Sequence, residues 1–245
     1  MRRFLFWSLF PFVFPQALYI RKTAPRFPGA AGPPKGSVGL GKPVKLIAIG
    51  DSVIAGVNAS NLSRALVGQT AAGLSRLLPG AVTWQAFSSI GFTSHQVTQE
   101  LLPQLPAEPA DFMVVSVGVN DVTSLSRSAS WRRNLSALLT ALQQHSPQAL
   151  IAVTGIPPFE VFPLLPQPLR ALFGMRGKTF DSVAREVIAG YDTALHVPVN
   201  MNPDPAKLGA DGYHPSEETY TELGDLMAHH LVTRHKATGF HEAAS

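Results

Sequence analysis

Short apolar runs alternate with amphipathic segments along the chain from about residue 44 to residue 235. The first run, residues 46–49, leads directly into Gly50-Asp51-Ser52-Val53. Further runs predict strands over residues 82–87, 111–117, 150–153 and 194–197, with helices over 62–78, 93–105, 131–142, 178–190 and from 216 onward. Strand and helix alternate five times with short links, which is typical of a parallel sheet covered on both faces. We therefore expect an α/β fold with three layers (α/β/α) and a doubly wound, five-stranded parallel sheet.

The amino-terminal segment differs from the rest, because residues 4–20 are almost wholly apolar and are flanked by arginines. Its length is close to the roughly 20 residues that cross a bilayer, although Pro11 and Pro15 interrupt it. It can be a secretory signal, an uncleaved anchor, or a hydrophobic helix that lies on the body or on a membrane. We favour a membrane-associating arm, and thus a membrane-associated or exported protein over a free cytoplasmic one.

Residues 21–43 are rich in proline and glycine and have no periodicity, so they are interpreted as a tether. The sequence predicts a segment over 1–43, one folded domain over 44–235 and a flexible tail over 236–245. Residues 36–42 match part of a phosphate-binding loop. That interpretation is rejected because Pro43 stands where Ser or Thr should follow, and because the segment precedes a strand when it should follow one.

Composition narrows the function classes. The chain is 45% hydrophobic and 15% charged, which is typical of a folded core, and it contains no cysteine. Its net charge of +4 divides unevenly, since residues 1–42 hold seven basic residues and no acid, and the remainder holds 13 basic and 16 acidic residues. The folded body is thus acidic, which argues against a nucleic-acid partner. No histidine pair has zinc-protease spacing, so neither a metal nor a cofactor is expected, and the oligomeric state stays open.

Polar or small residues follow the first three predicted strands: Ser52, Gly91 and Asn120. Because the carboxyl ends of parallel strands share one edge of a sheet, we expect these residues to lie there together. Asp211 precedes His214 by three residues, and such a carboxylate can accept the imidazole Nδ1 proton and leave Nε2 for a nucleophile. These parts meet the requirements of acyl transfer. Taken alone, Ser52 could equally be a helix cap.

In these blocks the sequence resembles the GDSL esterases, the branch of serine hydrolases also called SGNH hydrolases. The blocks are Gly50-Asp51-Ser52-Val53, Gly91, Gly118-Val119-Asn120-Asp121 and Asp211-Gly212-Tyr213-His214-Pro215. The resemblance covers about residues 44–235 and implies a flavodoxin-like SGNH hydrolase fold. Two departures are that Val53 replaces the usual leucine and that Gly91 follows isoleucine where the family commonly has a small residue.

The resemblance implies a role for each matching residue. Ser52 is the implied nucleophile, His214 the general base and acid, and Asp211 the residue that orients the imidazole. The implied oxyanion hole consists of the backbone N–H groups of Ser52 and Gly91 and the side-chain amide of Asn120. The serines at positions 88 and 89 are the nearest alternatives to Gly91.

The connection after the fourth strand, residues 156–166, is rich in proline and phenylalanine and starts at the same sheet edge. Phe159 and Phe162 could line an acyl pocket, form a mobile lid or cover the core. We favour the pocket, and hence a carboxylesterase acting on small acyl esters of short or medium chain. The alternatives are a lysophospholipase or thioesterase acting on membrane lipids, a carbohydrate deacetylase, and a non-catalytic flavodoxin-like ligand-binding domain.

Overall fold

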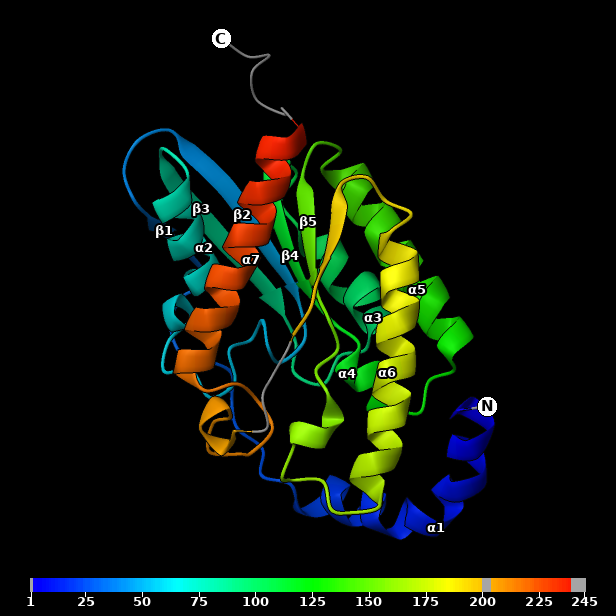
Figure 1. Ribbon diagram of the computed structural model, residues 1–245. Coiled ribbons are helices and arrows are strands. Elements are labelled where there is room, and N and C mark those ends of the chain that lie inside the picture. The colour runs from blue at the N-terminus through cyan, green and yellow to red at the C-terminus, as the bar shows by residue number, and fades with distance from the viewer. Residues whose placement is uncertain (1, 200–203, 239–245) are drawn as a thin grey trace.

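The computed structural model describes residues 2–199 and 204–238, which form a six-stranded sheet with helices on both faces (Figure 1). The strands lie in the order β1-β3-β2-β4-β5-β6. Their bounds are Lys35–Val38 (β1), Pro43–Gly50 (β2), Ala81–Ser88 (β3), Phe112–Ser116 (β4), Leu150–Thr154 (β5) and Ala194–Val197 (β6). Strands β2 to β6 are parallel, in the order of a flavodoxin-like sheet. The predicted three-layer α/β/α architecture is confirmed.

The sheet has one strand more than the sequence predicted. Strand β1 pairs antiparallel with β3, in a segment that was predicted to be a tether. Gly36 makes this pairing possible, because a Cβ atom there would lie 2.5 Å from the indole ring of Trp84. The five predicted parallel strands are β2 to β6, and the antiparallel edge strand β1 adds a sixth that the sequence did not predict. A four-residue edge strand within a glycine- and proline-rich stretch has too little alternation to be recognised.

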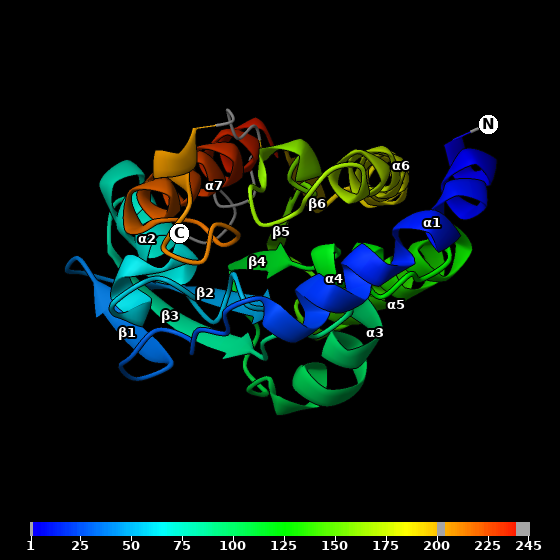
Figure 2. The ribbon, with the colours of Figure 1, turned by 90° about the horizontal axis from the view of Figure 1, so that it is seen from below.

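Helices α2 (Leu66–Leu77) and α7 (Glu217–Thr238) pack side by side on one face of the sheet, and α5 (Ser128–His145) and α6 (Leu169–Ile188) cover the other (Figures 1 and 2). Each buries an apolar stripe at helical spacing, as the sequence predicted. On α5 the buried residues are Trp131, Leu135, Leu138, Leu139 and Leu142. Strands β4 and β5 between them are buried at every position, which explains their continuous apolar runs.

Several element boundaries differ from the prediction. Helix α6 begins at Leu169, so the connection after β5 is shorter than expected, and Pro168 precedes the first turn, where proline is tolerated. The predicted helix over 93–105 is α3 (Ser94–Gln96) followed by a π-helical turn over Val97–Leu101 and a tighter 3₁₀ turn over Leu102–Gln104. At the carboxyl end, α7 extends three residues beyond the predicted domain, and the predicted tail from residue 239 lies outside the described residues.

Helix α1 (Arg2–Thr23) lies against α6 and crosses the end of the molecule at which the parallel strands finish (Figures 1 and 2). Phe6, Phe10 and Val13 point inward and are buried in the core beside α6. Of the helices in the described ranges, none combines the length and the apolar character that crossing a bilayer requires. The location of the protein stays a prediction.

Candidate active site

Ser52 lies in the tight turn that follows β2, the strand flanked by β3 and β4 near the centre of the sheet. The turn approaches β4 closely, and the Asp51 N–H donates to the Ser116 carbonyl at 3.0 Å. A Cβ atom at Gly50 would lie 2.0 Å from that same carbonyl oxygen. Only glycine therefore fits before Asp51, and the close contact fixes Ser52 at the carboxyl edge of the sheet.

Asp211 and His214 lie in the loop before α7, and the structure brings both to Ser52. His214 Nε2 is 2.9 Å from Ser52 Oγ, and His214 Nδ1 is 2.6 Å from Asp211 Oδ2. The three side chains thus form one hydrogen-bonded row, although 162 positions separate the serine from the histidine. Asp211 is buried and His214 is half-buried, so the row is largely shielded from solvent.

The protonation of the row follows from the environment of Asp211. Burial by itself would raise the pKa of its carboxyl group, but hydrogen bonds from His214, Asn58 and Tyr213 outweigh burial and hold the pKa well below its ordinary value. An ionised carboxylate only accepts hydrogen bonds, so His214 Nδ1 carries the proton. In the neutral imidazole Nε2 then accepts the hydrogen bond of the Ser52 hydroxyl.

Asn58 is a part of this site that the sequence analysis missed. Its Nδ2 donates to Asp211 Oδ1 at 2.9 Å, beside the backbone N–H groups of Tyr213 and His214, which donate to the same oxygen at 2.9 Å. Its φ of 72° lies in the left-handed region, which asparagine tolerates better than most residues. Nothing in the local sequence indicates this role, because the partner lies 153 positions away.

The sequence blocks that contain Gly91 and Asn120 lie next to each other, beside the turn that carries Ser52. Asn120 lies in α4 (Val119–Thr123), and its Nδ2 donates to the Phe92 carbonyl at 3.0 Å and approaches Asp51 Oδ2 at 3.4 Å. Gly91, next to Phe92, has a φ of 84°, and a Cβ built on it would meet no atom within 4 Å. Within the described residues, neither the Ser52 N–H nor the Gly91 N–H donates to a protein acceptor.

Asp121 holds the block that contains Asn120 against the turn that contains Gly91. Its carboxylate, fully buried, accepts hydrogen bonds from the backbone N–H of Ser94 at 2.9 Å and from the Ser94 hydroxyl at 2.7 Å. Burial raises the pKa of Asp121, and the bonds from Ser94 offset part of that rise. This contact holds the turn that contains Gly91.

A cavity of ≈ 50 Å³ opens beside Ser52 and His214. Its apolar wall includes Phe162, Val199 and Leu223. Of the two phenylalanines predicted to line a pocket, Phe162 does so. Phe159 is fully buried, packs edge-on against Phe162 and belongs to the core behind the wall. Helix α6 begins soon after this segment, and Phe159 is enclosed by the core, so it has no free side to offer the cavity.

Asp51 is a second carboxylate next to the serine, and its environment is opposite to that of Asp211. Burial raises its pKa to about 6, while hydrogen bonds from the Val53 N–H and the Ser116 hydroxyl and the positive charge of a protonated His214 offset part of the rise. Both carboxylates are almost inaccessible to solvent. The two carboxylates differ in their hydrogen-bond donors. Asp211 accepts four bonds, from the Asn58 side chain, the Tyr213 N–H, and the backbone N–H and ring of His214. Asp51 has one close N–H donor within the described residues, Val53 at 3.1 Å.

Comparison with known proteins shows the family to which the chain belongs. The model of the GDSL-like lipase/acylhydrolase family matches residues 48–221. The chain therefore belongs to the GDSL-like lipase/acylhydrolase family, a class of ester-bond hydrolases. It is similar to the GDSL-like esterase Rv1075c of Mycobacterium tuberculosis, with 27% identity over 195 residues that cover 75% of this chain. The matched part spans only 60% of that relative's length.

Solved structures support the fold. A lipase/acylhydrolase from Enterococcus faecalis is similar with a TM-score of 0.58 and 22% identity, covering 78% of this chain and 96% of that one. The psychrotrophic esterase EstA from Pseudoalteromonas sp., in a structure inhibited by monoethylphosphonate, has a TM-score of 0.58 and 17% identity, covering 79% and 98%. At these identities the likeness establishes a shared fold.

The raised pKa of Asp51 leads to a pH-dependent stability. Below its unfolded pKa of 3.8 both states hold the proton, and between 3.8 and about 6 the folded protein alone does. We expect the free energy of unfolding to fall as pH rises through this window, by up to about 3 kcal/mol for this group. The Asp51→Asn variant should lack this component. Urea denaturation of both proteins across the window measures it, and parallel curves would contradict the assignment.

Proposed function

We propose that this chain hydrolyses carboxylic esters with short- to medium-chain acyl groups through an acyl-enzyme formed on Ser52. One observation carries the proposal: the hydrogen-bonded row Ser52–His214–Asp211, at 2.9 Å and 2.6 Å, borders an apolar cavity. A helix cap needs neither the histidine nor the cavity. Family membership supports ester hydrolysis in general, and the geometry supports the mechanism below.

In the first half-reaction Ser52 Oγ attacks the ester carbonyl carbon while His214 Nε2 takes the hydroxyl proton. The carbonyl electron pair moves to oxygen, and the imidazolium that forms is stabilised by the Asp211 carboxylate. The tetrahedral intermediate then collapses. The bond to the alcohol oxygen breaks, and His214 gives its proton to the leaving alcohol. Because Asp211 stays ionised, His214 always presents Nε2 to the serine.

In the second half-reaction water replaces the alcohol. His214 Nε2 takes a proton from the attacking water, whose oxygen bonds to the acyl carbon of the enzyme ester. The second tetrahedral intermediate expels Ser52 Oγ, which regains its proton from His214. The carboxylic acid leaves, and the enzyme returns to its starting protonation.

Both intermediates carry a negative oxygen that needs donors. The backbone N–H groups of Ser52 and Gly91 suit this role because both are unused by the described residues. Asn120 lies between the Gly91 turn and the serine turn, as its bonds to Phe92 and Asp51 record. A substrate oxygen arriving here can take over one amide hydrogen of Asn120, giving the three donors that the proposal assigns.

Variants of Ser52 and of Asn120, the third proposed oxyanion donor, test the mechanism. We expect a fluorophosphonate probe to label the protein, and Ser52→Ala to abolish both labelling and hydrolysis of a chromogenic short-chain ester. Asn120→Ala should lower kcat on the order of 10²–10³-fold, since one oxyanion donor is lost. Ser60→Ala is the control and should behave as wild type, because Ser60 is exposed in the loop after β2 that also carries Ser52. Full activity in Asn120→Ala would contradict its assigned role.

The wall of the cavity sets the expected chain length. Phe162 is a large apolar side chain in the cavity wall, so Phe162→Ala should enlarge the acyl site and shift the preferred ester towards longer chains. Phe159→Leu changes the core behind the wall and should leave the preference unchanged. The measurement is kcat/KM over a series of p-nitrophenyl esters. If wild type and Phe162→Ala show the same dependence of kcat/KM on chain length, the assignment of Phe162 to the acyl site is contradicted.

The same assay separates the alternatives. A lysophospholipid, an acyl-coenzyme A thioester and an acetylated sugar, added as competing substrates, distinguish a lysophospholipase, a thioesterase and a deacetylase from a carboxylesterase. A non-catalytic ligand-binding domain would neither turn over any of them nor react with the fluorophosphonate.

A further inference from the structure

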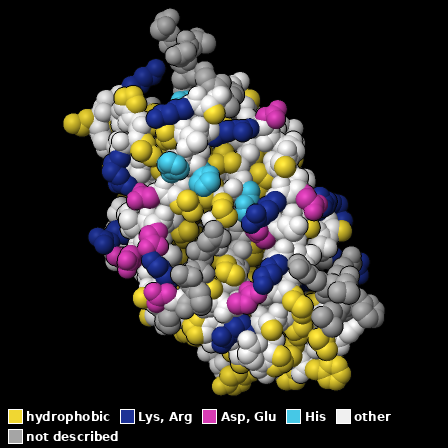
Figure 3. All heavy atoms as spheres, in the orientation of Figure 1, with side chains coloured by type: hydrophobic (Ala, Val, Ile, Leu, Met, Phe, Trp, Pro, Cys, Tyr) yellow, Lys and Arg dark blue, Asp and Glu magenta, His cyan; other side chains and the backbone are white. Residues whose placement is uncertain are grey.

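The outer side of helix α1 exposes a concentration of large apolar side chains. Of the ten such residues that are exposed in the described chain, six lie on this helix: Trp7, Leu9, Phe12, Phe14, Leu18 and Tyr19. Phe12 is 82% exposed and Tyr19 is 64% exposed. The two are seven positions apart, which places them on the same side of the helix. The apolar atoms gather along the lower end of the molecule in Figure 3, where α1 runs.

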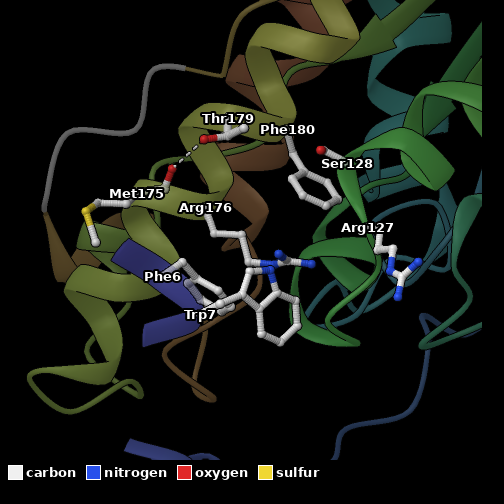
Figure 4. Close-up of a pocket in the computed structure, with 8 residues that line it drawn as sticks. All are labelled: Phe6, Trp7, Arg127, Ser128, Met175, Arg176, Thr179 and Phe180. Atoms are coloured by element: carbon white, nitrogen blue, oxygen red, sulfur yellow. Dashed lines mark hydrogen bonds between the residues drawn. The ribbon is translucent and has the colours of Figure 1, made fainter. Parts of the chain in front are cut away.

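The inner side of α1 is firmly attached to the body, so the outer side is a fixed surface of the folded protein. Arg176 of α6 lies between aromatic rings from both elements, with its guanidinium carbon 4.9 Å from the Phe6 ring centre and 4.6 Å from that of Phe180 (Figure 4). Its Nε donates to the Val122 carbonyl at 2.9 Å, and a second bond goes to Ser126. This buried cation joins α1 to the α4 region.

Positive charge accompanies the apolar surface. Arg21 and Lys22 in the last turn of α1, and Arg26 just after it, are all exposed. Residues 1–42 contain seven basic residues and no acidic one, whereas the rest of the chain is net negative. Aromatic side chains beside lysines and arginines are the composition of helices that lie in the interface of an anionic bilayer. A second copy of this chain would present the same cations, so self-association here would oppose like charges.

Helix α1 is also connected to the candidate active site. It lies against α6, at the end of the molecule at which the parallel strands finish (Figures 1 and 2). Ring contacts lead inward from Phe10 through Phe173, Phe159 and Phe162 to Tyr213, with ring centres 4.7–6.5 Å apart. The last ring, Tyr213, packs against the His214 ring at 5.1 Å. The exposed helix is thus the outermost layer of the packing that forms the cavity wall.

We propose that the outer side of α1 is a docking surface for an anionic lipid bilayer, and that docking holds the catalytic edge of the sheet at the lipid surface. Phe12 and Tyr19 enter the interface, and Arg21, Lys22 and Arg26 meet lipid phosphates. The substrate class that follows is an acyl ester that partitions into or belongs to the bilayer. That last step rests on the proposed ester hydrolase activity, whereas the docking surface does not.

Sedimentation of the full chain with vesicles tests the docking directly. We expect wild type to bind vesicles of phosphatidylglycerol and phosphatidylcholine, and to bind less as salt rises. The double variant Phe12→Glu/Tyr19→Glu should bind about tenfold more weakly or worse, because two aromatic side chains no longer enter the interface. Leu40→Glu is the matched control, since Leu40 is 92% exposed in the turn between β1 and β2 and should keep wild-type binding.

Hydrolysis of a soluble short-chain ester without vesicles should be the same in all three proteins, which shows that the double variant is folded. Equal vesicle binding by wild type and the double variant, or no binding by wild type, would overturn the docking surface. A wild-type dimer that the double variant converts to a monomer would assign the surface to a second copy. Vesicle binding without hydrolysis of any ester would contradict the proposed function and leave the docking surface supported.

Discussion

Four N–H groups converge on the carboxylate of Asp211, and the geometry of the site depends on that convergence. Two come from the backbone of its own loop, one from the His214 ring, and one from Asn58 in the loop after β2. A buried carboxylate without such donors would become neutral or remain costly to bury. With them it stays ionised, and it ties the carboxyl-terminal loop to the segment that carries Ser52. The imidazole is held between these two parts of the chain.

The sheet explains why this convergence is possible. Parallel strands bring the turns after β2, β3 and β4 to one edge, and the Gly50 contact with Ser116 brings the serine turn against β4. Asp121 holds the next turn through Ser94. These contacts position three backbone segments before any substrate is present. The cavity beside them is small and apolar, which agrees with the proposed acyl esters.

The sequence predicted this arrangement where its signals are local. An apolar run that ends in Gly-Asp-Ser predicts a strand and a turn, and an aspartate three residues before a histidine predicts a hydrogen-bonded pair. Strand β1 was missed because its four residues lie in a stretch whose prolines and glycines indicate a tether. Asn58 was missed because its role depends on a left-handed backbone conformation and on a partner 153 positions away. For α1 the sequence left several interpretations open, and only the packing of Phe6 and Phe10 separates its inner side from its outer side.

The central claim is that the ionised Asp211 fixes which imidazole nitrogen faces Ser52. The variant Asp211→Asn keeps the size of the side chain but can donate to Nδ1, which places the imidazole proton on the wrong nitrogen. The kcat of this variant on a soluble short-chain ester, measured beside its thermal unfolding, is the most direct test. We expect kcat to fall on the order of 10⁴-fold with the fold intact. An Asp211→Asn enzyme that is folded and retains wild-type kcat would contradict it.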